Sequence, residues 1–140
     1  KNKNIYIHGR NDDVINIRGH RIGSEEVEST ILNLSQITEC CAVMLDDYLE
    51  GGKIYLFVVS KVNLDNQIEK LIISAFGSYA LPKKIFYVPQ IPKTRSGKML
   101  RGLLRNILKK PKSRNYGDIS TILNINTLKE VKKIIINSYD

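Results

Sequence analysis

Cysteine is scarce in this sequence of 140 residues, and its two cysteines, Cys40 and Cys41, are neighbours in the chain. Adjacent residues of a strand point to opposite faces of a sheet, so a disulfide between these two would be badly strained. We therefore expect two buried or half-buried thiols in a reducing compartment. Neither histidine, His8 or His20, has a cysteine near it. We expect no metal-ligand cluster and treat both histidines as structural.

Long apolar runs are also absent. No stretch reaches the roughly 18 apolar residues that a membrane-spanning helix needs, and the segment after residues 1–4 is too short and polar for a signal peptide. These features predict a cytoplasmic or nucleocytoplasmic protein that does not bind a membrane. Because the chain starts without Met in the middle of a pattern, we expect a fragment or a processed product.

Acidic residues are the minority among the charged ones. The sequence has 14 Asp and Glu against 22 Lys and Arg, which gives a formal net charge of +8. A positive field of this kind favours an anionic partner, such as a nucleotide, coenzyme phosphates, nucleic acid or an acidic membrane. The charge therefore narrows the classes of partner without choosing one of them.

The hydrophobic pattern predicts an α+β domain, in which helices flank a small three-stranded sheet and an N-terminal β-hairpin projects at one edge. We expect the hairpin within residues 5–18, with its turn at residues 9–13 and with Gly19 ending its second strand. A helix with one apolar face should follow, capped by Ser24.

The three strands of the sheet are expected at residues 40–45, 54–59 and 85–88. Residues 46–53 are polar and contain two glycines, so a long loop should join the first two strands. Further helices are expected after Asp65, after Lys98 and from Thr127, where residues 127–130 have the pattern of a capping box.

Residues 92–98, PKTRSGK, are a basic loop directly before an apolar helical stripe. Pro92 restricts the backbone at the entry, and Gly97 permits a conformation closed to other residues just before Lys98. A lysine after such a turn can bind phosphate as a flexible point charge. The loop is not a Walker A motif, because Met99 stands where Ser or Thr is required. On this pattern alone, a solvated basic loop is the competing interpretation.

Two motifs about eighty residues apart carry a resemblance to one family. Residues 9–23, GRNDDVINIRGHRIG, followed by EVE at 26–28, resemble the hinge motif of adenylate-forming acyl-CoA synthetases. Residues 92–98 resemble their catalytic-lysine loop. The tail, GDISTIL at 117–123 and LKEV at 128–131, is similar to the C-terminal end of the acetyl-CoA synthetases in that family. The resemblance runs through essentially the whole chain, in the right order and spacing.

The resemblance implies that the chain is the small, mobile C-terminal domain of a larger AMP-forming ligase. Residues 1–13 would be the end of the hinge from a missing N-terminal domain, and residues 14–140 the C-terminal domain itself. The family reaction converts acetate, ATP and CoA into acetyl-CoA, AMP and pyrophosphate through an acetyl-adenylate. The C-terminal domain rotates between the two half-reactions. Mg²⁺ and most of the ATP site would belong to the N-terminal domain, so we expect the isolated chain to be inactive.

The resemblance also implies roles for individual residues. Lys98 would be the adenylation lysine, bridging the carboxylate and the α-phosphate, and also a site for a lysine acetyltransferase and deacetylase. Arg21 would contact the ATP phosphates and Arg10 the ribose. Asp12 would be the hinge residue, which absorbs backbone rotation. The competing interpretations are a surface lysine at 98 and arginines that only pair with nearby carboxylates such as Glu26.

Gly19 would let the pantetheine arm of CoA pass close to the backbone, with Arg18 lining the tunnel. Family members often carry a small residue at Arg18, so this arginine either adds a phosphate contact or narrows the tunnel. Acetyl-CoA synthetases tend to place a CoA-phosphate-binding arginine where this chain has Ile73, and Lys70 or Lys83 would have to replace it. Three main-chain carbonyls match positions that hold a cation in related enzymes, those of Leu32, Leu34 and Ile37.

Three alternatives stay open. The acyl pocket would lie in the missing domain, so a propionyl-CoA or other short-chain ligase fits the same residues. A basic nucleic-acid-binding module fits the charge, but no aromatic residue is interleaved with the basic ones in residues 93–114, as a stacking surface for single strands would require. An interaction module in which Lys98 is only a regulated acetylation site also fits.

Overall fold

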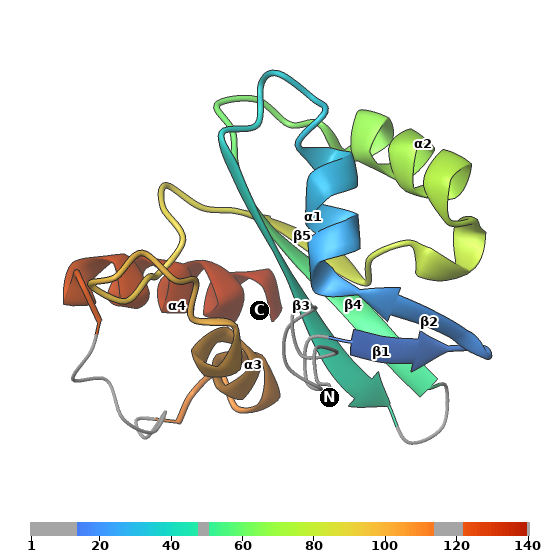
Figure 1. Cartoon of the computed structure of the whole chain (residues 1–140). Coiled ribbons are helices and arrows are strands. Elements are labelled where there is room, and N and C mark those ends of the chain that lie inside the picture. Colours follow the sequence, from blue (N-terminus) through green and yellow to red (C-terminus); the bar gives the residue numbers. More distant parts are fainter. Residues whose placement is uncertain (1–13, 48–50, 114–121, 140) are drawn as a thin grey trace, which may run out of the picture.

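The computed structural model describes residues 14–47, 51–113 and 122–139, and these residues form two small sheets and several helices (Figure 1). The two-stranded sheet consists of β1 (Val14–Ile17) and β2 (His20–Gly23). The three-stranded sheet has the order β3 (Glu39–Asp47), β4 (Gly51–Val59), β5 (Lys84–Tyr87), with β3 antiparallel and β5 parallel to β4. The helices are α1 (Ser24–Ile31), α2 (Asp65–Ala75), the 3₁₀ helix η3 (Ser78–Ala80), α3 (Arg101–Lys109) and α4 (Ile125–Tyr139).

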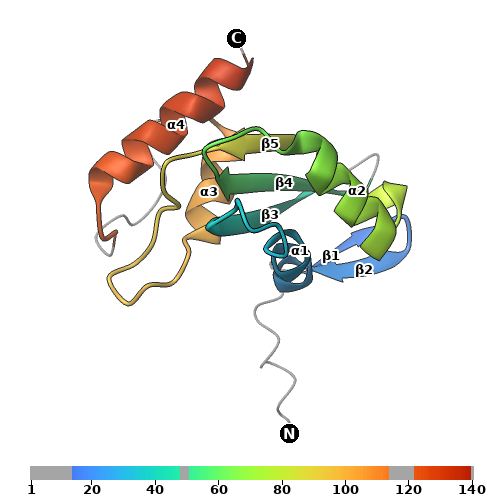
Figure 2. The same ribbon diagram turned by 90° about the horizontal axis from the view of Figure 1, so that it is seen from above.

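Helices cover both faces of the three-stranded sheet, and each face has its own core (Figure 2). The first core joins the sheet to α1, α2 and the hairpin, whereas the second joins it to α3 and α4. Cys40 belongs to the first core and Cys41 to the second, and both are buried thiols that form no disulfide. The predicted α+β class, the three-stranded sheet and the opposite orientation of the two cysteines are therefore confirmed.

The N-terminal hairpin lies later in the chain than the sequence pattern predicted. β1 pairs with β2 from Val14↔Gly23 to Ile17↔His20, so the turn consists of Arg18 and Gly19. Both residues have positive φ, 49° and 85°, as a two-residue hairpin turn of the primed type requires. The prediction that Gly19 ends the hairpin was therefore wrong, because it makes the turn inside it. Residues 5–13 lie outside the described residues.

The long loop predicted at residues 46–53 was also wrong. β3 and β4 stay paired as far as Asp47↔Gly51. Gly51 and Gly52 belong to β4, and Gly52 packs directly beneath Ile15 of the hairpin. A side chain at position 52 would overlap that isoleucine, so the glycine is needed for packing between β4 and β1.

Two predicted helix caps are misplaced. The cap of α1 is Gly23, whose N–H donates to the Glu26 side chain at 3.1 Å, and Ser24 is a buried residue of the first turn. α4 begins at Ile125, before the predicted capping box at 127–130. The Thr127 hydroxyl donates instead to Oε1 of Gln90 at 3.0 Å, which links α4 to the segment after β5. No helix among the described residues is long and apolar enough to cross a bilayer.

Candidate functional site

The segment that joins β5 to α3 contains a narrow, hydrogen-bonded loop, which we call the lysine loop (residues 92–99). Lys93 and Met99 pair across it as an antiparallel bridge, and the Thr94 N–H donates to the Lys98 carbonyl at 2.9 Å. The turn closes through the Gly97 N–H, which donates to the Thr94 carbonyl at 2.9 Å. Gly97 has a φ of 94°, so the conformational freedom expected of this glycine is used here.

Lys98 projects from this loop into solvent. Its N–H donates to Oγ1 of Thr94 at 3.1 Å, which holds the backbone, while the residue as a whole is exposed. Within the described parts of the chain, its ammonium has no side-chain partner. The arrangement presents one positive charge on a long side chain from a backbone that is held in place, and such a charge can meet an anionic ligand.

The first half of the lysine loop is attached to the rest of the domain at Lys93. The Lys93 ammonium forms an ion pair with Glu39, the first residue of β3. The Lys93 carbonyl accepts a hydrogen bond from the Leu123 N–H at 2.9 Å, and Thr94 forms a bridge with Ile122. The loop therefore lies against the segment that leads into α4, as the gold trace beside α4 in Figure 1 shows.

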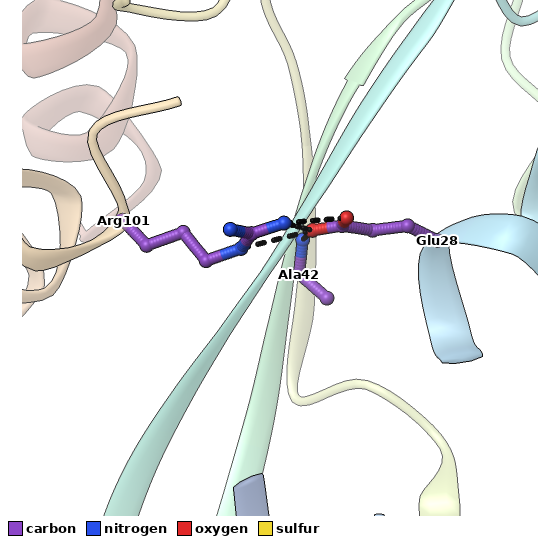
Figure 3. Close-up of polar contacts among 3 residues, drawn as sticks. All are labelled: Glu28, Ala42 and Arg101. Carbon is purple, nitrogen blue, oxygen red and sulfur yellow. Dashed lines mark hydrogen bonds and ion pairs between the residues drawn. The ribbon is translucent and has the colours of Figure 1, made fainter. Parts of the chain in front are cut away.

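The second half of the loop leads into a buried ion pair between α3 and α1 (Figure 3). Nη2 of Arg101 lies 2.6 Å from Oε1 and 2.8 Å from Oε2 of Glu28, and Nε donates to Oε2 at 3.2 Å. The same Oε2 accepts the Ala42 N–H at 2.8 Å. The two side chains are only 19% and 10% exposed. Burial raises the pKa of Glu28, although the hydrogen bonds from Arg101 and Ala42 oppose this shift.

This ion pair covers part of the free edge of the sheet, because β3 is an edge strand. Glu28 takes up the outward N–H of Ala42, and one helical turn later Nε of Arg105 donates to the Met44 carbonyl at 2.9 Å. In the sequence, Glu28 belongs to the hinge motif and Arg101 to the predicted helix after Lys98, but the pattern predicts no role for either side chain. The sequence did contain an indication of buried charge, since both residues fall on the apolar face of a helix. Glu28 lies beside Ile31, and Arg101 lies beside Leu104.

The other candidate residues lie on the hairpin. Arg18, Gly19 and Arg21 are exposed, and a Cβ on Gly19 would meet no atom of the domain within 4 Å. The ring of His20 stacks on Tyr79 with a centroid separation of 4.1 Å, which fits the structural role expected of this histidine. Beside the turn, a hollow of about 280 Å³ is lined by three cationic residues, Arg18, Lys53 and Lys83.

The structure does not bring Lys98 together with the hairpin residues. The lysine loop lies near α4, whereas β1 and β2 lie on the far side of the sheet, in both views (Figures 1 and 2). Arg10 and Asp12 lie outside the described residues. Ile73 is 47% exposed on α2, and Lys83, a suggested replacement for an arginine there, lines the hollow beside Arg18.

The three residues proposed to hold a cation follow α1 directly. The Leu34 carbonyl accepts the Ile37 N–H at 3.1 Å, so one of the three carbonyls already takes part in a turn. Leu32 is exposed and Ile37 is buried. Among the described residues, no group of three or more His, Cys, Asp or Glu side chains is placed to hold a metal ion.

Comparison with known proteins adds a family match and relatives. Residues 26–98 match the family described as AMP-binding enzyme C-terminal domain. The chain is 40% identical to an acetyl-coenzyme A synthetase of Helicobacter pylori strain G27 over 96% of its length, and 35% identical to a propionate–CoA ligase of Salmonella typhimurium over 93%. It spans only 22% of the length of each of these relatives.

Solved structures show the same fold. The acetoacetyl-CoA synthetase from Streptomyces lividans superposes with a TM-score of 0.73 over 94% of this chain and 20% of that protein, at 20% identity. The acyl-CoA synthetase of Brucella canis gives a TM-score of 0.61 over 69% of this chain and 19% of that protein, at 32% identity.

Proposed function

Since the chain belongs to the family of the AMP-binding enzyme C-terminal domain, we propose that it is the C-terminal domain of an AMP-forming acetyl-CoA synthetase. Such a ligase joins acetate to CoA at the expense of ATP, through an acetyl-adenylate. The similarity to acetyl-coenzyme A synthetases over 96% of the chain supports this proposal. In this proposal the substrate pocket lies outside the chain, which alone is inactive.

The observation that carries the proposal is the exposed Lys98 on a hydrogen-bonded loop. In the first half-reaction, its ammonium would lie between the acetate carboxylate and the α-phosphate of ATP, where negative charge gathers during transfer. A fixed backbone with a free charged end suits that task, because the position is set while the ammonium can still adjust. Arg21 would add a contact to the phosphates and Arg10 to the ribose.

In the second half-reaction the hairpin would face the active site in place of the lysine loop. The open space around the α-carbon of Gly19 fits the close passage of a pantetheine arm, and Arg18 lies beside it. Because Lys98 and Gly19 lie on separate sides of the sheet, one active site cannot use both at once. A rotation about Asp12, between a linker at 1–13 and a domain at 14–140, would resolve this.

ATP, Mg²⁺ and CoA are the cofactors and substrates of this proposal, with Mg²⁺ held by the N-terminal domain. Leu32, Leu34 and Ile37 would offer main-chain oxygens to a further cation. An acetyltransferase that modifies Lys98 would remove its charge and so stop adenylation, and a deacetylase would restore it. The buried thiols of Cys40 and Cys41, which form no disulfide, support a reducing compartment, in the cytoplasm or nucleocytoplasm.

Lys98→Ala in the full-length ligase tests the proposal. Acetate-dependent exchange of pyrophosphate into ATP measures adenylation, and CoA consumption from supplied acetyl-adenylate measures thioester formation. We expect exchange to fall by about 10²–10³-fold, since an electrostatic contact to the transition state is lost, with thioester formation retained. Lys133→Ala, on the exposed side of α4, removes the same charge and should leave both rates unchanged. Exchange that survives in Lys98→Ala would show that the lysine has no role in adenylation.

A second candidate substrate is propionate, because one relative is a propionate–CoA ligase. The ratio of kcat/KM for acetate and propionate in the full-length ligase decides between them. A methylene group in an apolar pocket is worth about 10–200-fold, so the preference should be clear. The relatives named above are ligases and lend no support to the alternative of a nucleic-acid-binding module.

A further inference from the structure

The buried pair of Glu28 and Arg101 lies at the start of α3, directly after the lysine loop. Arg101 is the first residue of this helix and stands three residues after Lys98. The Leu100 N–H donates to the Pro92 carbonyl at 3.1 Å, so the base of the loop is closed just before the ion pair. A displacement of Arg101 would therefore displace the exit of the loop.

The geometry of the pair is more restrictive than a simple charge contact. Both oxygens of Glu28 engage the guanidinium, and the same carboxylate holds the Ala42 N–H of β3. Bidentate arginine–carboxylate pairs fix direction as well as distance. The start of α3 is thus tied at once to α1 and to the backbone of the edge strand.

The other end of the loop is tied to the same strand. Lys93 pairs with Glu39 at the beginning of β3, and Glu28 binds Ala42 three residues further along. The two attachment points lie on either side of the exposed part of the loop, residues 95–98. The base of the loop is therefore held at both ends, while Lys98 itself is exposed.

Stability alone does not account for a buried pair of this kind. Removing two charges from water costs free energy, and burial indeed raises the pKa of Glu28. Apolar residues of similar size are often equally or more stable in such places. They would pack α1 against the sheet and α3, but they would not fix the direction in which α3 begins.

We propose that Glu28 and Arg101 are positioning residues for Lys98, holding the exit of the lysine loop so that the ammonium reaches the reacting carboxylate and phosphate. This inference rests on the proposed role of Lys98 in adenylation. It predicts that loss of the pair impairs the adenylation half-reaction and leaves the thioester half-reaction unaffected, because only the first uses this loop.

The test uses Arg101→Met, Arg101→Lys and Glu28→Gln in the full-length ligase, with both half-reactions and the midpoint of urea unfolding measured. Misplacing a catalytic group by about 1 Å can cost about 100-fold in rate. We expect adenylation to fall by about 10–100-fold in Arg101→Met and Glu28→Gln, with thioester formation within about twofold of wild type. Arg101→Lys keeps the charge without the bidentate contact, so its adenylation rate should be intermediate.

Arg105→Met is the matched control. Arg105 belongs to the same helix as Arg101 and its guanidinium contacts the same edge strand, but it lies one helical turn further from the lysine loop. We expect this substitution to lower the unfolding midpoint without a selective loss of adenylation. If Arg101→Met and Arg101→Lys lower both half-reactions in parallel, or lower neither, the positioning role is wrong and the pair only supports the fold.

Lys98→Ala, measured beside these variants, separates the positioning role of the ion pair from the role of the lysine itself. Adenylation lost in Lys98→Ala but kept in Arg101→Lys and Glu28→Gln would overturn the positioning role alone. Adenylation kept in Lys98→Ala would overturn the proposed role of Lys98, and the positioning role with it.

Discussion

At the scale of single residues, Glu28 shows how burial and pairing oppose each other. Burial is the largest influence on its carboxyl group and raises the pKa above the ordinary value of 4.5, against the pull of Arg101. The folded chain therefore holds this proton more tightly than the unfolded chain does. Stability contributed by the proton is present at low pH and is lost as the pH rises from about 4.5 through the folded-state pKa.

Glu28→Gln removes the titrating carboxyl group, so a comparison with the wild type should show whether folding raises or lowers the pKa of Glu28. We expect the free energy of unfolding of the wild type, minus that of the variant, to decrease as the pH rises from about 4 towards neutrality. Urea unfolding of this chain at a series of pH values measures the difference. If the difference increases with pH instead, the attraction of Arg101 exceeds the cost of burial, and the pKa is lowered.

At the scale of elements, the periodic patterns predicted the helices and buried strands well. The strand predicted at residues 40–45 correctly placed Cys40 and Cys41 on opposite faces of the sheet, because successive side chains of any strand point to opposite faces. The sequence pattern was wrong at the turn between β3 and β4. A polar, glycine-containing stretch at 46–53 resembles a loop, yet most of it pairs as strand. The small size of Gly52, and not its flexibility, serves the packing of Ile15.

The candidate site was predictable in part. Exposure of Lys98 follows from a polar loop with Gly97 before the lysine, and the structure confirms that conformation. The ion pair of Glu28 with Arg101 could not be found from local pattern, because its partners are 73 residues apart and meet only through tertiary packing. A charged residue on the apolar face of a helix indicates only that some partner exists.

Gly52→Ala tests the packing of the hairpin on β4. The added Cβ would overlap Ile15 and lie 3.1 Å from the Asn16 carbonyl oxygen, so we expect a loss of about 1–3 kcal/mol in the free energy of unfolding. Gly102→Ala is the control, since its Cβ would meet nothing within 4 Å and it lies inside α3. Because Gly102 is the second residue of the helix, that change should raise the free energy of unfolding by no more than the helix-interior value of about 0.5–1 kcal/mol. Equal effects of the two substitutions in chemical denaturation would argue against the packing role of Gly52.

At the scale of the whole molecule, each of the two faces of the domain carries a turn that contains a glycine with positive φ. Gly19 in the hairpin and Gly97 in the lysine loop have φ of 85° and 94°, and a Cβ added to either residue would meet no atom within 4 Å. An alanine at either site would carry a similar backbone strain of about 1–2 kcal/mol without a steric clash inside the domain. The two alanine variants therefore control for each other, because they add a similar backbone strain at two different places in the domain.

Gly97→Ala and Gly19→Ala should affect opposite half-reactions of the full-length ligase. Under the proposed function, we expect Gly97→Ala to slow adenylation, because the strain would act on the loop of Lys98. We expect Gly19→Ala to slow thioester formation, because the methyl group would obstruct the proposed path of the CoA arm. A clear loss of rate in the matching half-reaction, with little change in the other, would support alternate use of the two faces. A loss of the same half-reaction in both variants would contradict it.

The edge strand β3 has a further consequence for how copies of this chain behave in concentrated solution. Strand edges with unpaired backbone groups act as templates for intermolecular pairing and aggregation. Here the carboxylate of Glu28 occupies the Ala42 N–H, and the guanidinium of Arg105 occupies the Met44 carbonyl. Glu28 and Arg105 thus also protect the edge of β3 from pairing with another copy of the chain. Their replacement would expose these backbone groups, so we expect the variants to precipitate more readily even where the fold is retained.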